Sequence, residues 1–114
     1  MTATSSGGGY HLNELGITGL RTGNNWYVNL GKTYGNMIIQ TGVLPTAGLI
    51  TTIVFPIRFT VNYNLFALHS GTNGLNMCEL YTSHNLLQTQ IRTLSLSDGS
   101  ASTGWIIYWL AIGY

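Results

Sequence analysis

The amino-acid sequence predicts an all-β domain, an antiparallel β-sandwich or small barrel of about six to seven short strands. Runs of β-branched and aromatic residues, each the length of a strand, recur between turns rich in Gly, Asn, Asp and Pro. No segment offers twelve residues of helical periodicity with capping residues at its ends. The length of 114 residues suits one domain, and a hydrophobic fraction of 45% is enough for a core.

The strand-length runs follow one another through short connections. In chain order they span residues 26–30, 37–41, 49–55, 65–69, 77–82, 89–96 and 105–112. Short turns join antiparallel neighbours, so we expect antiparallel pairing throughout. Residues 1–25 precede these runs and are expected to lie outside the domain, which then spans 26–114. The Ser- and Gly-rich residues 1–9 are typical of a flexible leader, whereas 10–25 fit either a short helical turn or extended chain.

The run over 89–96 breaks the simple alternation of a strand. Its apolar residues Ile91 and Leu94 are three positions apart, although residues on one face of a strand are two apart. A β-bulge near Arg92 and Thr93 would restore the register. Alternatively, Leu94 or Leu96 faces a partner.

The last run is apolar on both faces and carries no charge. One face holds Trp105, Ile107, Trp109 and Ala111, and the other holds Ile106, Tyr108, Leu110 and Ile112. A strand with one solvated face alternates apolar and polar residues, so both faces of this one must be covered. The chain's own core can cover one face, and the second predicts contact with another subunit.

The composition excludes several classes of function. Charged residues make up 6% of the chain, against roughly 25% in an ordinary soluble domain. With four Lys and Arg and a net charge of +1, no basic stripe for nucleic acid can form. No apolar run approaches the ~20 residues of a membrane helix, so membrane insertion is not expected. A single cysteine, Cys78, and no Asn-X-Ser/Thr sequon fit synthesis in a bacterial cytoplasm.

We expect the protein to have no catalytic activity, no cofactor and no metal site. The three carboxylates, Glu14, Glu79 and Asp98, lie in separate segments, and no Gly-X-Ser-X-Gly motif occurs. The three histidines, His11, His69 and His84, match no metal-ligand spacing. The one alternative is a threefold axis that gathers three copies of one histidine around an ion.

Three motifs resemble the C-terminal domain family of phage and prophage tail-fibre proteins. That family carries a strand like Gly-Leu-Ile-Ile-Gln-Trp-Gly, a Val-X-Phe-Pro-X-X-Phe corner and a terminal Trp-X-Ala-Ile-Gly-Tyr. In the same order this chain has Met37-Ile38-Ile39-Gln40-Thr41-Gly42, then Ile53-Val54-Phe55-Pro56-Ile57-Arg58-Phe59, and last Trp109-Leu110-Ala111-Ile112-Gly113-Tyr114. Thr41 departs from the family, which often has Trp there. The resemblance covers roughly residues 26–114.

The resemblance implies a homotrimeric tip domain that contacts the host surface, with residues 1–25 as a leader or the end of the fibre shaft. It implies a fold similar to the trimeric H-type lectins, six-stranded antiparallel sandwiches that bind sugars partly through the loop before the last strand. The corresponding loop here, residues 97–103, lacks the aromatic residue of those lectins.

Three polar loops are the candidate ligand sites, because sugars are bound by hydrogen-bonding groups beside an apolar platform. The candidate residues are Ser97, Asp98, Ser100, Ser102 and Trp105 in the first loop, His69 and Asn73 in the second, and His84 and Asn85 in the third. The candidate core and trimer residues are Trp109, Ile106, Tyr108, Leu110, Phe55 and Phe59.

The favoured function is a virion tail-fibre tip that binds a bacterial surface saccharide or an outer-membrane protein without catalysis. A structural trimerisation cap without a ligand, a free H-type-like lectin and a depolymerase are the alternatives.

Overall fold

The computed structural model describes residues 16–45, 50–70, 76–100 and 106–114, with the backbone alone over 76–83. The strands are β1 (Thr18–Thr22), β2 (Asn25–Asn29), β3 (Ile38–Pro45), β4 (Ile50–Val54), β5 (Tyr63–Ser70), β6 (Asn76–His84), β7 (Gln88–Ser95) and β8 (Ile106–Gly113), and a 3₁₀ turn, η1 (Lys32–Tyr34), joins β2 to β3. No helix in the described part of the chain has the length and hydrophobicity to cross a bilayer.

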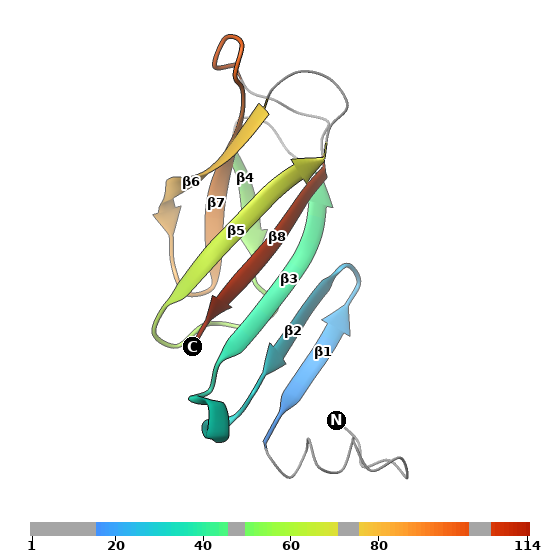
Figure 1. Cartoon of the computed structure of the whole chain (residues 1–114), viewed down its shortest axis with the longest axis vertical. Coiled ribbons are helices and arrows are strands. Elements are labelled where there is room, and N and C mark those ends of the chain that lie inside the picture. The colour runs from blue at the N-terminus through green and yellow to red at the C-terminus, as the bar shows by residue number, and fades with distance from the viewer. Residues whose placement is uncertain (1–15, 46–49, 71–75, 101–105) are drawn as a thin grey trace.

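The strands form two antiparallel sheets that face each other (Figure 1). One sheet has the order β1-β2-β3-β8-β5, and the other has the order β4-β7-β6. Strand β8 lies between β3 and β5 and pairs with both along its whole length. The prediction of an all-β antiparallel sandwich is confirmed, with eight strands in the described residues rather than six to seven.

The additional strand is β1, which lies inside the range 1–25. It pairs with β2 from Thr18 opposite Asn29 to Thr22 opposite Asn25. Gly23, at φ 62°, makes the tight turn between the two strands, a backbone conformation that glycine adopts without strain. A Gly-Asn pair between two strand-like runs is a hairpin signal, so this turn was detectable in the sequence. Residues 1–15 lie outside the described residues, and the division of the chain at residue 25 stays a prediction.

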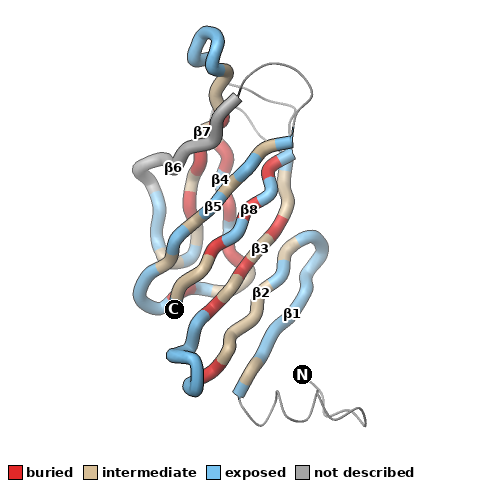
Figure 2. Tube along the Cα trace, viewed as in Figure 1, coloured by how far each residue is buried: buried red, intermediate tan, exposed pale blue. Residues whose placement is uncertain are grey.

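The core lies between β3, β8 and β5 on one side and β4 and β7 on the other. Its fully buried apolar residues are Ile38, Ile53, Phe55, Phe59, Ile91, Ile107, Trp109 and Ala111. Phe55 is at its centre, with ring centroids 5.1 Å from Phe59, 4.8 Å from Tyr63 and 5.7 Å from Trp109. Buried residues alternate with less buried ones along β3, β7 and β8, as Figure 2 shows.

Strand β7 is regular, so the predicted bulge near Arg92 and Thr93 is wrong. Thr89, Ile91 and Thr93 point inward and are fully buried, while Leu94 lies outside this inward set. The prediction counted only apolar residues, but the β-branched threonines take the inward positions and keep the two-residue period. The irregularity lies instead in β6, whose register with β7 shifts between Leu80 and His84.

Gln40 ties the first of the three sequence motifs to the second. It is completely buried, and its amide Nε2 donates a 2.8 Å hydrogen bond to the carbonyl of Ile57. The backbone N–H of Ile57 in turn donates a 2.9 Å hydrogen bond to Gln40 Oε1. One side chain therefore satisfies both backbone groups of the residue that follows the Phe55-Pro56 corner, where no sheet partner exists.

Two glycines allow the third motif to pack against the rest. A Cβ on Gly42 would lie 2.7 Å from the Trp109 indole, so only glycine lets this ring lie across β3. A Cβ on Gly113 would overlap the carbonyl of Asn62. Nearby, the backbone oxygen of Tyr114 accepts hydrogen bonds from the N–H groups of residues 60, 61 and 62. The three motifs are therefore one set of mutual contacts.

Replacement of Gln40 by leucine is expected to lower the free energy of unfolding by about 2–3 kcal/mol. The substitution keeps the volume but leaves the N–H and C=O of Ile57 without partners in a partly buried site. Urea unfolding at one fixed protein concentration measures the loss.

The matched control is Gln90→Leu. Gln90 makes an exposed 3.3 Å hydrogen bond to Thr52 Oγ1, and its loss should cost less than about 0.5 kcal/mol. Equal urea midpoints for Gln40→Leu and the unmodified chain would show that these two hydrogen bonds do not hold the corner.

Candidate functional site

In the described part of the loop over 97–103, the polar side chains form hydrogen bonds with one another and with the backbone of the same turn. Asp98 Oδ1 accepts a 2.9 Å hydrogen bond from the Ser100 N–H and a 2.7 Å hydrogen bond from the Ser100 hydroxyl. These bonds, that of the hydroxyl first, lower the pKa of the Asp98 carboxyl below its ordinary value. The Ser97 hydroxyl lies 2.8 Å from that of Ser95. This loop stands out at one end of the molecule in Figure 1, and Ser102 and Trp105 lie outside the described residues.

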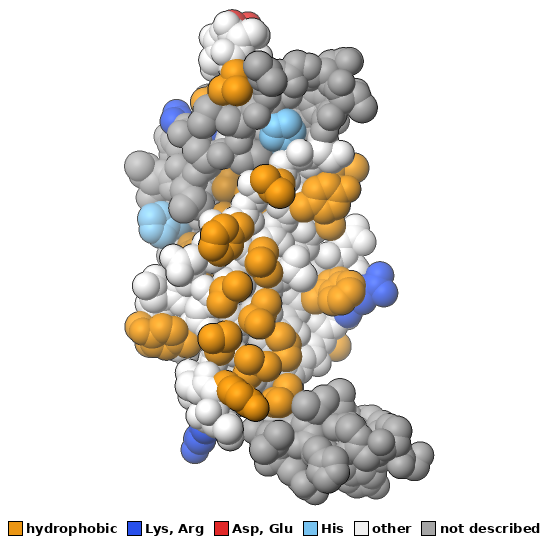
Figure 3. All heavy atoms as spheres, viewed as in Figure 1, with side chains coloured by type: hydrophobic (Ala, Val, Ile, Leu, Met, Phe, Trp, Pro, Cys, Tyr) orange, Lys and Arg blue, Asp and Glu red, His pale blue; other side chains and the backbone are white. Residues whose placement is uncertain are grey.

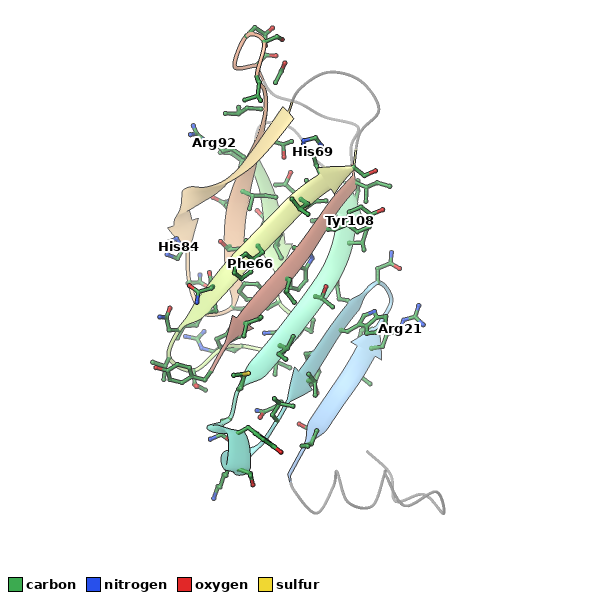
Figure 4. The ribbon with its side chains drawn as sticks, viewed as in Figure 1. Arg21, Phe66, His69, His84, Arg92 and Tyr108 are labelled. Atoms are coloured by element: carbon green, nitrogen blue, oxygen red, sulfur yellow. The ribbon has the colours of Figure 1, made fainter. Side chains whose placement is uncertain are left out.

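Of the residues in the other two candidate loops, His69 lies toward the same end of the molecule as the first loop, since Ser70 pairs with Ile106 at the start of β8, whereas His84 lies apart from it (Figure 4). His69 is half-buried near the end of β5, opposite Ile107 of β8, and Asn73 lies outside the described residues. His84 is exposed at the end of β6. Asn85 uses its side chain locally, because its Oδ1 accepts hydrogen bonds from the N–H groups of Leu87 at 2.8 Å and Gln88 at 3.0 Å. Among the described residues, His84 and Asn85 therefore do not share a site with His69 or with the turn over 97–100.

A cleft of about 240 Å³ opens beside His84. It lies where β5, the edge of the larger sheet, faces the end of β6 and the start of β7. Its other lining residues, which the sequence alone did not indicate, are Asn62, Tyr63, Asn64, Leu65, Phe66 and Thr89. The polar run Asn62-Tyr63-Asn64 after the Phe-Pro corner was the one signal for these residues.

The outer face of the larger sheet is apolar and exposed in the single chain. The exposed fractions are 59% for Phe66 and 75% for Leu68 on β5, and 44%, 50% and 36% for Ile106, Tyr108 and Leu110 on β8. Leu68 lies opposite Tyr108, and Phe66 lies opposite Leu110. Figure 3 shows a band of apolar side chains over β5, β8 and β3, with no charged side chain inside it. We call this surface the outer apolar face.

The sequence predicted that β8 is apolar on both faces. The two faces of this strand differ in how far they are exposed to solvent. Ile107, Trp109 and Ala111 are at most 3% exposed, whereas their neighbours Ile106, Tyr108 and Leu110 are at least 36% exposed. Contiguous exposed apolar patches on a protein mark interaction sites. Thr41, at the position where the resembled family often has Trp, also belongs to this side of the sheet, opposite Leu110.

Charged and metal-ligating groups are sparse on these surfaces. Arg21 lies beside the outer apolar face on β1, with its guanidinium carbon 5.7 Å from the centre of the Trp26 ring. Among the side chains that the structure describes, no three of His, Cys, Asp and Glu come together as metal ligands would.

The sandwich and its three contacting motifs are those of a phage tail-fibre domain. The chain belongs, over residues 32–114, to the family described as tail fiber protein gp53-like, C-terminal. Tail fibres are components of the virion.

The fold is similar to that of a solved N-terminally truncated R2-type pyocin tail fiber, with a TM-score of 0.64 over 99% of this chain and 16% sequence identity. This chain spans 44% of that fiber chain. No curated protein matches the sequence.

The carboxyl of Asp98 is expected to titrate below the ordinary aspartate pKa of about 3.9. The turn therefore gains stability from this carboxylate above the ordinary pKa and loses it as the pH falls through the lowered pKa. Replacement of Ser100 by alanine removes the hydroxyl donor and should move the Asp98 pKa upward.

Carboxyl NMR chemical shifts followed between pH 2 and pH 6 measure both values. An Asp98 pKa that is equal in the two proteins would show that the carboxylate is not held by Ser100.

Proposed function

We propose that this tail-fibre domain forms the tip of a homotrimeric fibre and binds a bacterial surface saccharide without catalysis. The observation that carries the proposal is the outer apolar face, which an isolated chain leaves in water. The area around Phe66, Leu68 and Tyr108 is too contiguous and too apolar for a surface that stays solvated. Further copies of the same chain are the occupants that a tail fibre supplies.

The low charge of the chain supports a saccharide as the receptor. A chain with seven charged residues presents mainly amides, hydroxyls and backbone to a ligand. Such groups both donate and accept hydrogen bonds, as sugar hydroxyls require. Binding through them depends little on ionic strength, because there is little charge to screen.

Trimerisation and binding are connected in this proposal. Saccharide sites are weak singly, and three linked copies raise the effective concentration of the second and third contacts. The fibre then attaches the virion to the host, in whose cytoplasm the protein is made.

The first test changes the outer apolar face. Leu68→Glu places a charge at the most exposed position of that face, 75% exposed, and is expected to shift the protein from trimer to monomer in analytical ultracentrifugation. Capture of the protein by host cells should fall at least ~10-fold as avidity is lost.

The control is Val54→Glu, a similar change at a residue that is 54% exposed on β4 of the other sheet. It should leave both the mass and the capture unchanged. If Leu68→Glu leaves a trimer, the outer apolar face is not the interface, and if monomers are captured as well as trimers, avidity has no part in binding.

The second test identifies the receptor. Trimeric protein should bind cells of the host on which the phage grows, and periodate treatment of those cells, which oxidises saccharides, should abolish binding, while protease treatment should not. Loss of binding after protease treatment alone would make the receptor an outer-membrane protein. A trimer that binds no host cell would be a structural cap, and new reducing ends released from host polysaccharide would make it a depolymerase.

A further inference from the structure

We propose that the cleft between β5 and the β6–β7 end binds a single neutral sugar ring of the surface saccharide. This inference rests on the proposed function and specifies where on the domain the saccharide binds. Its lining residues, named above, come from the edges of both sheets.

The clearest sign of a ligand is a pair of buried hydroxyl groups without hydrogen bonds. Thr89 is completely buried, and its Oγ1 has no hydrogen-bond partner among the residues that the structure describes. The Tyr63 hydroxyl is likewise buried and unpaired. Both residues line the cleft. Buried polar groups in folded proteins are nearly always hydrogen-bonded. The Thr93 hydroxyl is also buried and unpaired, but Thr93 does not line the cleft, so the sign of a ligand is that two such residues line the same cleft.

The chemistry of the remaining lining residues selects the class of ligand. Asn62 and Asn64 line the cleft and are exposed. Asn64 offers an amide donor and acceptor, whereas Asn62 Oδ1 accepts a 2.8 Å hydrogen bond from the Tyr63 N–H, so Asn62 offers chiefly its amide donor. Phe66 also lines the cleft, but its ring belongs to the outer apolar face and is not counted as part of the sugar site. No Lys, Arg, Asp or Glu lines the cleft. A site with hydroxyls and amides, but no charge, suits a neutral hydroxylated ring and offers no ion pair to a phosphate or a carboxylate.

The size of the cleft suits one ring. Pockets for drug-sized ligands measure ~300–1,000 Å³, and this cleft of about 240 Å³ is somewhat smaller. The register shift of β6 between Leu80 and His84 lies beside it, and bulges of this kind are common next to binding sites, where they redirect a strand. After the shift, His84 pairs with Thr89, which brings the imidazole and the buried hydroxyl to the same end of the sandwich.

Two other hollows fit a sugar less well. One, lined by Tyr34, Met37 and Ile112 among others, shares Tyr63 with the cleft but lacks Thr89, so it has one unpaired hydroxyl in its lining instead of two. The other, of about 510 Å³ between the β1–β2 hairpin and η1, includes Lys32 and contains no buried unpaired side-chain group. Of these three, the β5–β6 cleft is the one lined by both Tyr63 and Thr89, whose hydroxyls are unpaired.

The chain offers a closely matched pair of variants for the test. Thr89 and Thr93 are both on the inner face of β7, both are completely buried, and both have an unpaired Oγ1. Thr89 lines the cleft and Thr93 does not. Thr89→Val and Thr93→Val each exchange one hydroxyl for a methyl group of similar size. Neither breaks a hydrogen bond among the described residues, so neither should lower the melting temperature of the protein.

The experiment is an NMR titration of the trimeric protein with neutral monosaccharides, taken as methyl glycosides of hexoses, 6-deoxyhexoses and N-acetylhexosamines. At least one sugar is expected to shift the amide signals of His84 and Thr89 in a saturable manner. Thr89→Val should weaken that binding at least 10-fold, and Thr93→Val should leave it unchanged. His84→Ala, at an exposed position, provides a second variant that should weaken binding without altering the core.

Three results would overturn the cleft as the site: no sugar shifts its signals, the shifts lie elsewhere, or the two threonine variants lose binding equally. Capture by host cells separates this failure from failure of the proposed function. Normal capture of Thr89→Val together with a cleft that binds no sugar would refute the cleft and leave receptor binding intact. Sugar binding in the cleft without capture of any host cell would refute the attachment function instead.

Discussion

Strand β8 is the element on which the structure depends, because it is apolar on both faces and lies inside the larger sheet. Its inner residues Ile107, Trp109 and Ala111 close the core of the sandwich. Its outer residues Ile106, Tyr108 and Leu110 remain in water when the chain is alone. Antiparallel sheets usually solvate one face, and β8 does not carry the polar residues that such solvation requires. The protomer is therefore a folded unit with an exposed apolar surface, which the proposed trimer would cover.

The motifs that identify the family are also the contacts that position β8. Gln40 hydrogen-bonds both backbone groups of Ile57, and Gly42 leaves room for the Trp109 ring. Gly113 admits the backbone at Asn62 without a clash. A change at one of these positions alters the packing at another, which gives a physical reason for finding the three motifs together in one chain.

Much of the fold could be predicted from the sequence, since strand length, β-branched composition and turn residues are local signals. The prediction failed where the apolar pattern was incomplete. β1 has an irregular pattern and is exposed throughout, and the inward threonines of β7 were not counted as core.

The candidate site was harder to predict from the sequence than the fold. Asp98 and Asn85 are polar loop residues as expected, but their side-chain oxygens accept hydrogen bonds from the backbone of their own turns. Tyr63 and Thr89 come together only because the two sheets stack.

The most direct measurement of the central claim is the reactivity of Tyr108 toward hydroxyl radicals in the assembled protein. In the single chain Tyr108 is 50% exposed, and Tyr34, on η1 away from the middle of the outer apolar face, is 55% exposed. Two rings of equal exposure should be oxidised at similar rates if nothing covers either. If copies of the chain cover β8, Tyr108 should be strongly protected while Tyr34 stays reactive. Equal oxidation of Tyr108 and Tyr34 would show that the outer side of β8 faces water, and would contradict the account.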